Sequence, residues 1–202
     1  MCECEVARIG QKVKDFKIET YNPVNFGFDE IDLAKLRQQG KWVILFFYPA
    51  DFTFVCPTEL ADLGGINDTL KEMDVVLVSM SCDTKFSHMA WRNSEKLLEN
   101  VQYQMGSDPT GEVARYFGVY DCGCGLPFRG TFIIDPDGNL VGQEVNFNNV
   151  GRNSEELLRK VRAFVHVRAN PAEVCPARWK PSDKTLTPSE KLVGNVYAAL
   201  KS

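Results

Sequence analysis

The chain contains the stretch Phe46-Phe47-Tyr48-Pro49-Ala50-Asp51-Phe52-Thr53-Phe54-Val55-Cys56-Pro57-Thr58-Glu59-Leu60, in which an apolar run is followed by a short loop and a Cys-Pro pair. The run from Trp42 to Phe47 is rich in β-branched and aromatic residues without polar alternation, which predicts a strand buried on both faces. Pro57 suits the first turn of a helix, where the N–H that it lacks would have no partner. Cys56 is therefore predicted at a helix N-terminus, where free N–H groups and the helix dipole favour a thiolate over a thiol. This makes Cys56 a candidate reactive cysteine, with a buried structural cysteine as the alternative.

The composition is typical of a soluble globular protein and argues against several function classes. A net charge of -4 disfavours nucleic acid as the main partner. No apolar run approaches the roughly 20 residues that a membrane-spanning helix needs. Residues 1–5 have neither the basic segment nor the apolar core of a signal peptide. We therefore expect a cytoplasmic protein that has no membrane partner.

Cysteine is unusually frequent for a cytoplasmic chain of this size. The number of cysteines is odd, and their spacing is not that of a secreted disulfide framework. Catalytic, redox-active or metal-binding roles are the alternatives in a reducing compartment. Because there are only two histidines and no His-Glu-x-x-His sequence, a zinc hydrolase has little support. The seven cysteines are Cys2, Cys4, Cys56, Cys82, Cys122, Cys124 and Cys175.

The remaining periodicity predicts strands that alternate with helices. A strand is expected near residues 13–18 and a hairpin over 130–146. A capping box at 153–156 opens a further helix. This order predicts an α/β fold with a central mixed sheet, parallel βαβ units and helices on both faces. The other expected elements are helices at 29–39, 56–73, 84–99 and 109–117, and strands at 42–48, 74–80 and 103–105.

A change of composition after Ala169 predicts a C-terminal extension rather than a second domain. We expect one domain over residues 1–169 and a proline-punctuated tail over 170–202. Thr187, Pro188 and Glu190 form a helix-start pattern, and the apolar stripe beyond them predicts one tail helix.

Glu59 lies at the position where a thioredoxin-type Cys-x-x-Cys motif would have its second cysteine. Disulfide oxidoreductase chemistry of that type is therefore disfavoured. The sequence Tyr48-Pro49-x-x-x-Thr53-x-x-Cys56 instead resembles the active-site motif of the peroxiredoxins. Glu173-Val174-Cys175-Pro176 resembles the resolving-cysteine segment of typical 2-Cys peroxiredoxins. Further matches over nearly the whole chain are Phe86–Trp91, Arg129–Asp135, Val150–Arg152 and a tail from Leu186 similar to the alkyl hydroperoxide reductase C type.

The resemblance implies a thioredoxin-like fold and a thiol peroxidase that reduces hydrogen peroxide and alkyl hydroperoxides. It implies that the thiolate of Cys56 attacks the O–O bond and becomes a sulfenic acid. Thr53 would hydrogen-bond the peroxide, Arg129 would stabilise the thiolate and the developing charge, and Pro49 would shield the sulfur from water.

The resemblance also implies supporting groups and partners. Glu59 and Arg152 would orient Arg129. Cys175 of a neighbouring subunit would form a disulfide with Cys56, so the chain would act as a homodimer, and five dimers can form a ring. No metal or organic cofactor is implied. Electrons would come from a protein dithiol, either thioredoxin or a flavoprotein disulfide reductase.

Asp121-Cys122-Gly123-Cys124-Gly125 departs from the family pattern, in which this loop is usually polar and acidic. Cys122 and Cys124 could form an auxiliary dithiol, or could react with Cys56. With Cys2 and Cys4 they could supply four thiolates to a metal, although the spacing is tighter than in zinc sites. The favoured interpretation is a loop of redox-labile surface thiols without an essential role in peroxide turnover.

Two sequence features of peroxide-sensitive relatives are absent, namely a Gly-Gly-Leu-Gly insertion and a C-terminal Tyr-Phe pair. Resistance to overoxidation is therefore expected. His88 is interpreted as structural and Cys82 as an apolar filler. The alternative functions are a thiol-based peroxide sensor or relay and a holdase chaperone.

Overall fold

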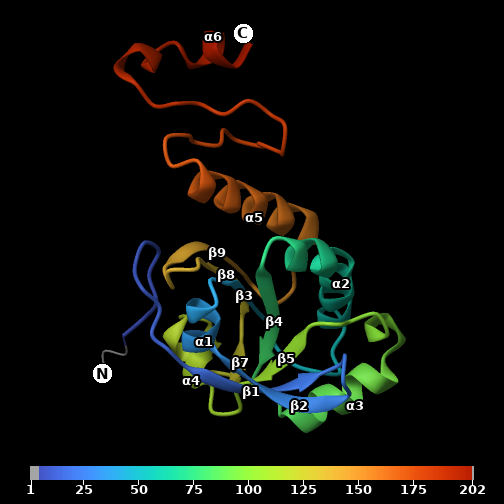
Figure 1. The fold of residues 1–202 in the computed structure, drawn as a ribbon. Coiled ribbons are helices and arrows are strands. Elements are labelled where there is room, and N and C mark those ends of the chain that lie inside the picture. The colour runs from blue at the N-terminus through green and yellow to red at the C-terminus, as the bar shows by residue number, and fades with distance from the viewer. Residues whose placement is uncertain (1–4, 202) are drawn as a thin grey trace. The chain divides into compact units, whose positions relative to one another are not determined.

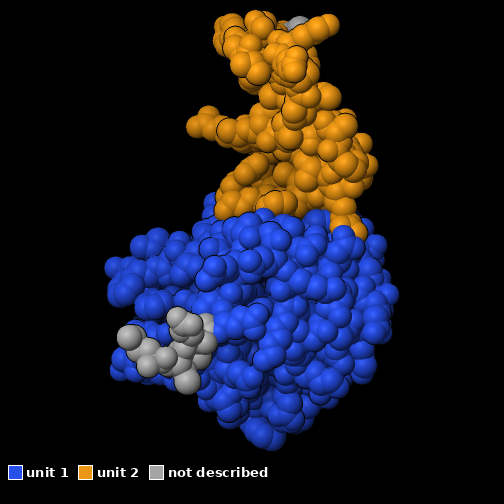
Figure 2. Space-filling model, turned by 90° about the vertical axis from the view of Figure 1, so that its left-hand side faces the viewer, with its two compact units in different colours: residues 1–154 blue, residues 155–202 orange. Residues whose placement is uncertain are grey.

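The computed structural model describes residues 5–201. The chain divides into two compact units, residues 1–154 and 155–202, which Figure 2 shows in different colours. In the described part of the chain, no helix has both the length and the apolar character needed to cross a membrane.

Unit 1 is built on a seven-stranded mixed sheet with the strand order β2-β1-β5-β4-β3-β8-β9 (Figure 1). Strands β3, β4 and β5 are parallel to one another, and the other pairs are antiparallel. The strands are β1 (Lys17–Asn22), β2 (Gly27–Asp32), β3 (Trp42–Phe47), β4 (Val75–Ser81), β5 (Gln104–Ser107), β8 (Arg129–Ile134) and β9 (Leu140–Asn146).

Helices cover both faces of this sheet, as the sequence predicts (Figure 1). Val43, Leu45 and Phe47 of β3 share one core with residues of α1 and α4. Because side chains alternate along a strand, Ile44 and Phe46 face the other side, where α2 and α3 lie. The helices of unit 1 are α1 (Leu33–Gln38), α2 (Cys56–Glu72), α3 (Lys85–Ser94) and α4 (Glu112–Tyr116).

The strand, loop and helix predicted around Cys56 are confirmed. All six residues of β3 are buried. Helix α2 begins at Cys56, contains Pro57 in its first turn and ends at Glu72. Parallel pairing of β3 with β4 completes a βαβ unit around α2.

Four predicted boundaries are wrong. The first strand was expected near residues 13–18, but β1 begins only at Lys17 and runs to Asn22. The helix expected at 29–39 begins only at Leu33, because residues 29–32 belong to β2 and pair with β1. The helix expected at 84–99 ends at Ser94, and its buried side chains include His88 and Trp91 rather than Phe86. Helix α4 cannot start at residue 109, because Gly111 before it has a left-handed φ of 66°.

Unit 2 contains nearly all of α5 (Ser154–Ala169) and an extended tail. An antiparallel bridge between Val174 and Leu186 closes the first part of the tail, through N–H···O bonds of 2.8 and 3.0 Å. The single tail helix predicted from Thr187 is wrong. The structure has a 3₁₀ turn (Glu190–Leu192) and then α6 (Val196–Lys201), because Gly194 between them has a left-handed φ of 76°.

Candidate active site

Cys56 lies at the start of α2, directly after the loop that follows β3. Its side chain is fully buried. The preceding residue, Val55, forms the N-cap of the helix and makes no side-chain hydrogen bond to it. The first turn of α2 is therefore held mainly by backbone bonds and packing.

Arg129 reaches Cys56 from the first position of β8. Strand β8 is antiparallel to β3, so its first residue lies at the end of β3 that leads to Cys56. Its Nη1 donates to the Cys56 sulfur over 3.4 Å and to the Glu59 carboxylate over 2.6 Å. Its Nε and Nη2 both donate to the carbonyl oxygen of Asn148, over 2.9 and 2.7 Å. These bonds fix the guanidinium in one orientation against the sulfur.

Arg152 completes the cluster from the segment before α5. It donates to Glu59 from its backbone N–H, Nε and Nη2, over 2.9, 2.8 and 3.2 Å. Its Nη1 donates to the Thr131 hydroxyl over 3.1 Å, and its guanidinium lies 3.3 Å from the ring centroid of Phe46. Burial lowers the pKa of Arg152 below its ordinary value, and the Glu59 carboxylate opposes that change.

The charged groups around Cys56 are buried. The side chains of Arg129, Glu59 and Arg152 are 4%, 2% and 3% exposed. Glu59 bonds to both guanidinium groups, and Glu144 also acts on Arg152. Arg129 in addition lies directly against the Cys56 sulfur, where its charge can stabilise negative charge that develops in a reaction.

Pro49 and Thr53 belong to the loop that leads to Cys56. Pro49 is buried and Thr53 is half-buried. The Thr53 hydroxyl donates its proton to the carbonyl of Ala50 over 2.7 Å. Its oxygen therefore keeps lone pairs that can accept a hydrogen bond from a peroxide hydroxyl.

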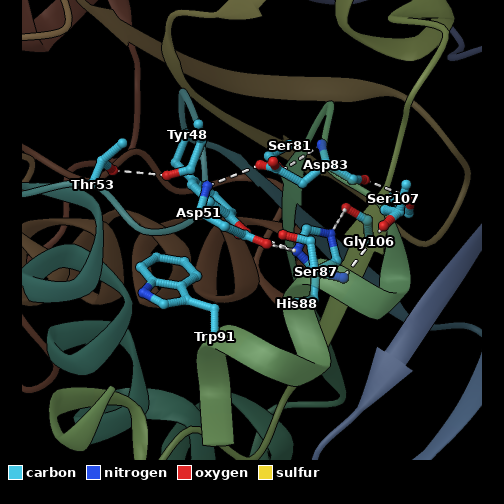
Figure 3. Close-up of polar contacts among 12 residues, drawn as sticks. Tyr48, Asp51, Thr53, Ser81, Asp83, Ser87, His88, Trp91, Gly106 and Ser107 are labelled. Carbon is cyan, nitrogen blue, oxygen red and sulfur yellow. Dashed lines mark hydrogen bonds and ion pairs between the residues drawn. The ribbon is translucent and has the colours of Figure 1, made fainter. Parts of the chain in front are cut away.

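A buried polar network holds this loop against α3 and β5 (Figure 3). The Tyr48 hydroxyl donates to Asp51 over 2.7 Å, and the other Asp51 carboxylate oxygen lies 2.8 Å from His88 Nδ1. His88 Nε2 lies 3.1 Å from the carbonyl oxygen of Gly106. The Gly106 carbonyl can only accept, so Nε2 donates to it, while Nδ1 shares a hydrogen bond with the Asp51 carboxyl group, and both ring nitrogens have partners. This supports the structural interpretation of His88.

Asp83 ties the same loop to the ends of β4 and β5 (Figure 3). Its carboxylate accepts from the Asp51 backbone N–H over 2.9 Å and from the Ser81 hydroxyl over 2.7 Å. The Ser107 hydroxyl donates to its backbone carbonyl over 2.7 Å. The loop is thus anchored to three neighbouring elements.

Cys175 belongs to unit 2, beside the bridge between Val174 and Leu186. The thiol is half-buried. Burial raises its pKa above the ordinary value, as does the nearby Glu173 carboxylate, while Arg159 opposes the change. An open groove of about 700 Å³ within unit 2 runs past Cys175.

Among the described residues, Cys82, Cys122 and Cys124 make no hydrogen bond to the cluster around Cys56. Cys122 and Cys124 lie exposed in a turn before β8. Burial raises the pKa of Cys82 to about 11, so this thiol stays protonated at neutral pH. Cys2 and Cys4 fall outside the described residues. Within residues 5–201, His, Cys, Asp and Glu side chains nowhere form a group of three or more that could hold a metal ion.

The structure thus joins Cys56, Glu59, Arg129 and Arg152, four of the residues that the sequence singled out. Sequence reasoning missed the Asn148 carbonyl, the Thr131 hydroxyl and the Phe46 ring. A backbone carbonyl has no signature in a sequence. Alternation along β3 could have placed Phe46 on the face of α2, next to Cys56.

Known proteins resemble this chain over most of its length. Residues 9–143 match the AhpC/TSA family. Alkyl hydroperoxide reductase C of Bacillus subtilis is 44% identical over 188 residues, which cover 93% of this chain and 98% of that protein. The corresponding protein of Staphylococcus saprophyticus is 43% identical over the same shares.

Solved structures give the same answer for the fold. The crystal structure of Enterococcus faecalis AhpC has a TM-score of 0.79 and 38% identity, covering 85% of this chain and 100% of that one. A reduced 2-Cys peroxiredoxin of Plasmodium vivax has a TM-score of 0.87 and 30% identity, covering 94% and 98%. The chain therefore belongs to the AhpC/TSA family, has the thioredoxin-like peroxiredoxin fold and is a thiol peroxidase of the alkyl hydroperoxide reductase C type.

Proposed function

We propose that Cys56 is the sulfur that reduces the peroxide, and that Pro49, Thr53 and Arg129 complete the catalytic site. The contact of Arg129 Nη1 with the Cys56 sulfur at 3.4 Å is the observation that carries this proposal. The thiolate attacks one peroxide oxygen, the O–O bond breaks, and Cys56 becomes a sulfenic acid. The other oxygen leaves with its electron pair and takes up a proton as water or an alcohol.

The neighbouring groups have separate roles in the first step. Arg129 stabilises the thiolate and then the negative charge on the leaving oxygen. Thr53 accepts a hydrogen bond from the peroxide hydroxyl and aligns the peroxide. Pro49 keeps water from the sulfur. Glu59 and Arg152 act through Arg129, because Glu59 receives bonds from both guanidinium groups.

The second step joins Cys56 to Cys175 of a second copy of the chain. The Cys175 sulfur attacks the sulfenic acid, and a disulfide and one water form. The buried Cys56 must first leave its position, and local unwinding of the first turn of α2 exposes it. The missing side-chain cap at Val55 makes this turn easier to unwind. The groove beside Cys175 leaves room for the partner's Cys56 segment.

A protein dithiol, either thioredoxin or a flavoprotein disulfide reductase, then returns both sulfurs to thiols. The unpaired cysteines fit a reducing, cytoplasmic environment. On this scheme residues 1–169 form the peroxidase domain, and residues 170–202 are the tail that supplies Cys175.

The homodimer has support in the exposed surfaces of unit 1. Strand β9 is an edge strand of the sheet, and a second β9 related by a two-fold axis would pair with it. A separate aromatic face contains Phe26, Phe28 and Phe86, which are 65%, 42% and 59% exposed. Clustered exposed apolar side chains mark association surfaces, so this face would join dimers into a ring.

A non-reducing gel after one equivalent of peroxide tests the scheme on the wild type, Cys56→Ser and Cys175→Ser. A covalent dimer is expected in the wild type and in neither variant. Mixing the two variants, with time for subunits to exchange, should restore a covalent dimer. A dimer that survives Cys56→Ser unchanged would show that other cysteines form it.

A further inference from the structure

Cys122 and Cys124 lie at the tip of a small hairpin that the peroxidase scheme does not use. Its strands, β6 (Tyr120–Asp121) and β7 (Leu126–Pro127), pair antiparallel directly before β8. The Gly125 N–H donates to the Asp121 carbonyl over 2.8 Å and closes the turn. Both thiols are free and exposed.

The Asp121 carboxylate is oriented toward one of these thiols. One oxygen accepts the Gly123 backbone N–H over 2.8 Å, and the other accepts the Cys124 S–H over 3.4 Å. The first bond holds the carboxylate in place over the turn. The second fixes the position of the Cys124 sulfur within the turn.

Two cysteines separated by one residue in a turn are close enough along the backbone to form a disulfide. A disulfide requires Cα atoms about 4.4–6.8 Å apart, and residues two apart in a bent backbone meet that condition. Gly123 between them has no side chain to obstruct the bond. A ring closed across one residue is strained, and strained, exposed disulfides are the labile ones.

We propose that Cys122-Gly123-Cys124 is a second redox site, a dithiol that exchanges with small-molecule or protein disulfides independently of Cys56. The thiolate of one cysteine attacks one sulfur of the external disulfide and releases the first thiol. The sulfur of the other cysteine then attacks the mixed disulfide and releases the second thiol. Two electrons and two protons pass to the external disulfide, and the turn disulfide remains. Because that product is strained, excess thiol reverses the reaction.

Trypsin isolates this site in one peptide. Cleavage after Arg115 and Arg129 gives residues 116–129, which contain Cys122 and Cys124 and no other cysteine. The full-length Cys56→Ser/Cys175→Ser variant is incubated with oxidised glutathione, or in a second arm with insulin as a protein disulfide, and is then alkylated and digested. The wild type is treated in parallel, so the result does not depend on folding of the variant.

The expected product is a peptide two hydrogens lighter than the dithiol, without alkyl groups and without glutathione. The incubation in which this peptide forms, with oxidised glutathione or with insulin, identifies the kind of disulfide that the site accepts. Cys122→Ser and Cys124→Ser should each instead trap a mixed disulfide on the cysteine that remains. A peptide that stays fully alkylated in both arms, or that carries glutathione on both cysteines, would overturn the proposal. Because the first variant lacks the proposed peroxidase thiols, this outcome is independent of the scheme for Cys56.

Discussion

Arg129 is the side chain that carries positive charge to the Cys56 sulfur, so its removal should affect the peroxide reaction directly. We expect Arg129→Met to slow that reaction by about 10²–10³-fold, the usual cost of losing one preorganised donor. Rapid-mixing kinetics with hydrogen peroxide measure this rate. Arg8→Met, which alters an exposed arginine, is the matched control and should react at the wild-type rate. Equal rates in both variants would exclude Arg129 from the reaction.

Cys175 should set the pH dependence of the second step. Its pKa lies above the ordinary value, because the thiol is partly buried and Glu173 is close. Below that pKa the thiolate fraction grows about tenfold per pH unit, so disulfide formation should accelerate as the pH rises. Glu173→Gln removes the negative charge, lowers this pKa and should shift the profile toward lower pH. Quenched time courses followed by mass spectrometry give the rate, with the exposed Glu190→Gln as control. An unchanged profile in Glu173→Gln would contradict this role of the carboxylate.

At the scale of elements, the loop between β3 and α2 depends on the hydrogen-bonded pair of Asp51 and His88. Both side chains are almost fully buried, so losing this bond leaves a desolvated polar group without its partner. Asp51→Asn should cost about 2 kcal/mol of the free energy of unfolding. It should also slow the peroxide reaction, because the loop carries Thr53. Asp68→Asn, which breaks an exposed pair with Lys71, should cost less than about 1 kcal/mol. Urea unfolding measures the free energy of unfolding of both variants. Equal losses of stability would argue against an anchoring role of Asp51.

The first turn of α2 should make overoxidation slow. This turn has no side-chain cap, so Cys56 can leave its buried position and meet Cys175 before a second peroxide arrives. Repeated turnover at modest peroxide should therefore leave Cys56 without sulfinic acid, as intact-mass measurements can show. Cys175→Ser is the control, because without a resolving thiol it should accumulate sulfinic acid. Rapid loss of wild-type activity together with a sulfinic Cys56 would refute the expectation.

The elements around Cys56 could be predicted because their signals are local. Strand β3 is an unbroken apolar run, and Pro57 marks the start of α2. Strand β2 was missed because Gly27-Phe28-Asp29-Glu30-Ile31-Asp32 is mostly polar, as an edge strand can be. Its identity as a strand depends on pairing with β1, which no local pattern reveals.

The candidate site was predictable only in part, and for the same reason. Cys56, Glu59, Arg129 and Arg152 were recognised from motifs, whereas the contacts that orient them depend on the packed fold. His88 illustrates the difference. It was interpreted as structural, but nothing local in the sequence names Asp51 and Gly106, the partners that satisfy both ring nitrogens and allow its burial.

At the scale of the whole molecule, the aromatic face of unit 1 should determine the largest assembly. Phe86 is 59% exposed and packs against Phe28, with ring centroids 5.1 Å apart. Phe86→Ser should shift the protein toward smaller species in sedimentation velocity, because it removes apolar area from this face. Ile9→Ser, at another exposed apolar residue, is the control and should leave the distribution unchanged. Identical distributions in all three proteins would place the contact elsewhere.

The contact of Arg129 with the Cys56 sulfur has a consequence for the timing of the proposed cycle. In that cycle a Cys56 thiolate is an anionic partner for the buried Arg129. When the sulfur becomes a neutral sulfenic acid, Arg129 loses this partner while Glu59 remains. The closed arrangement would thus lose stability at the step in which Cys56 has to leave it. On this view the reaction with peroxide itself promotes unwinding of the first turn of α2, whereas the reduced protein keeps Cys56 buried.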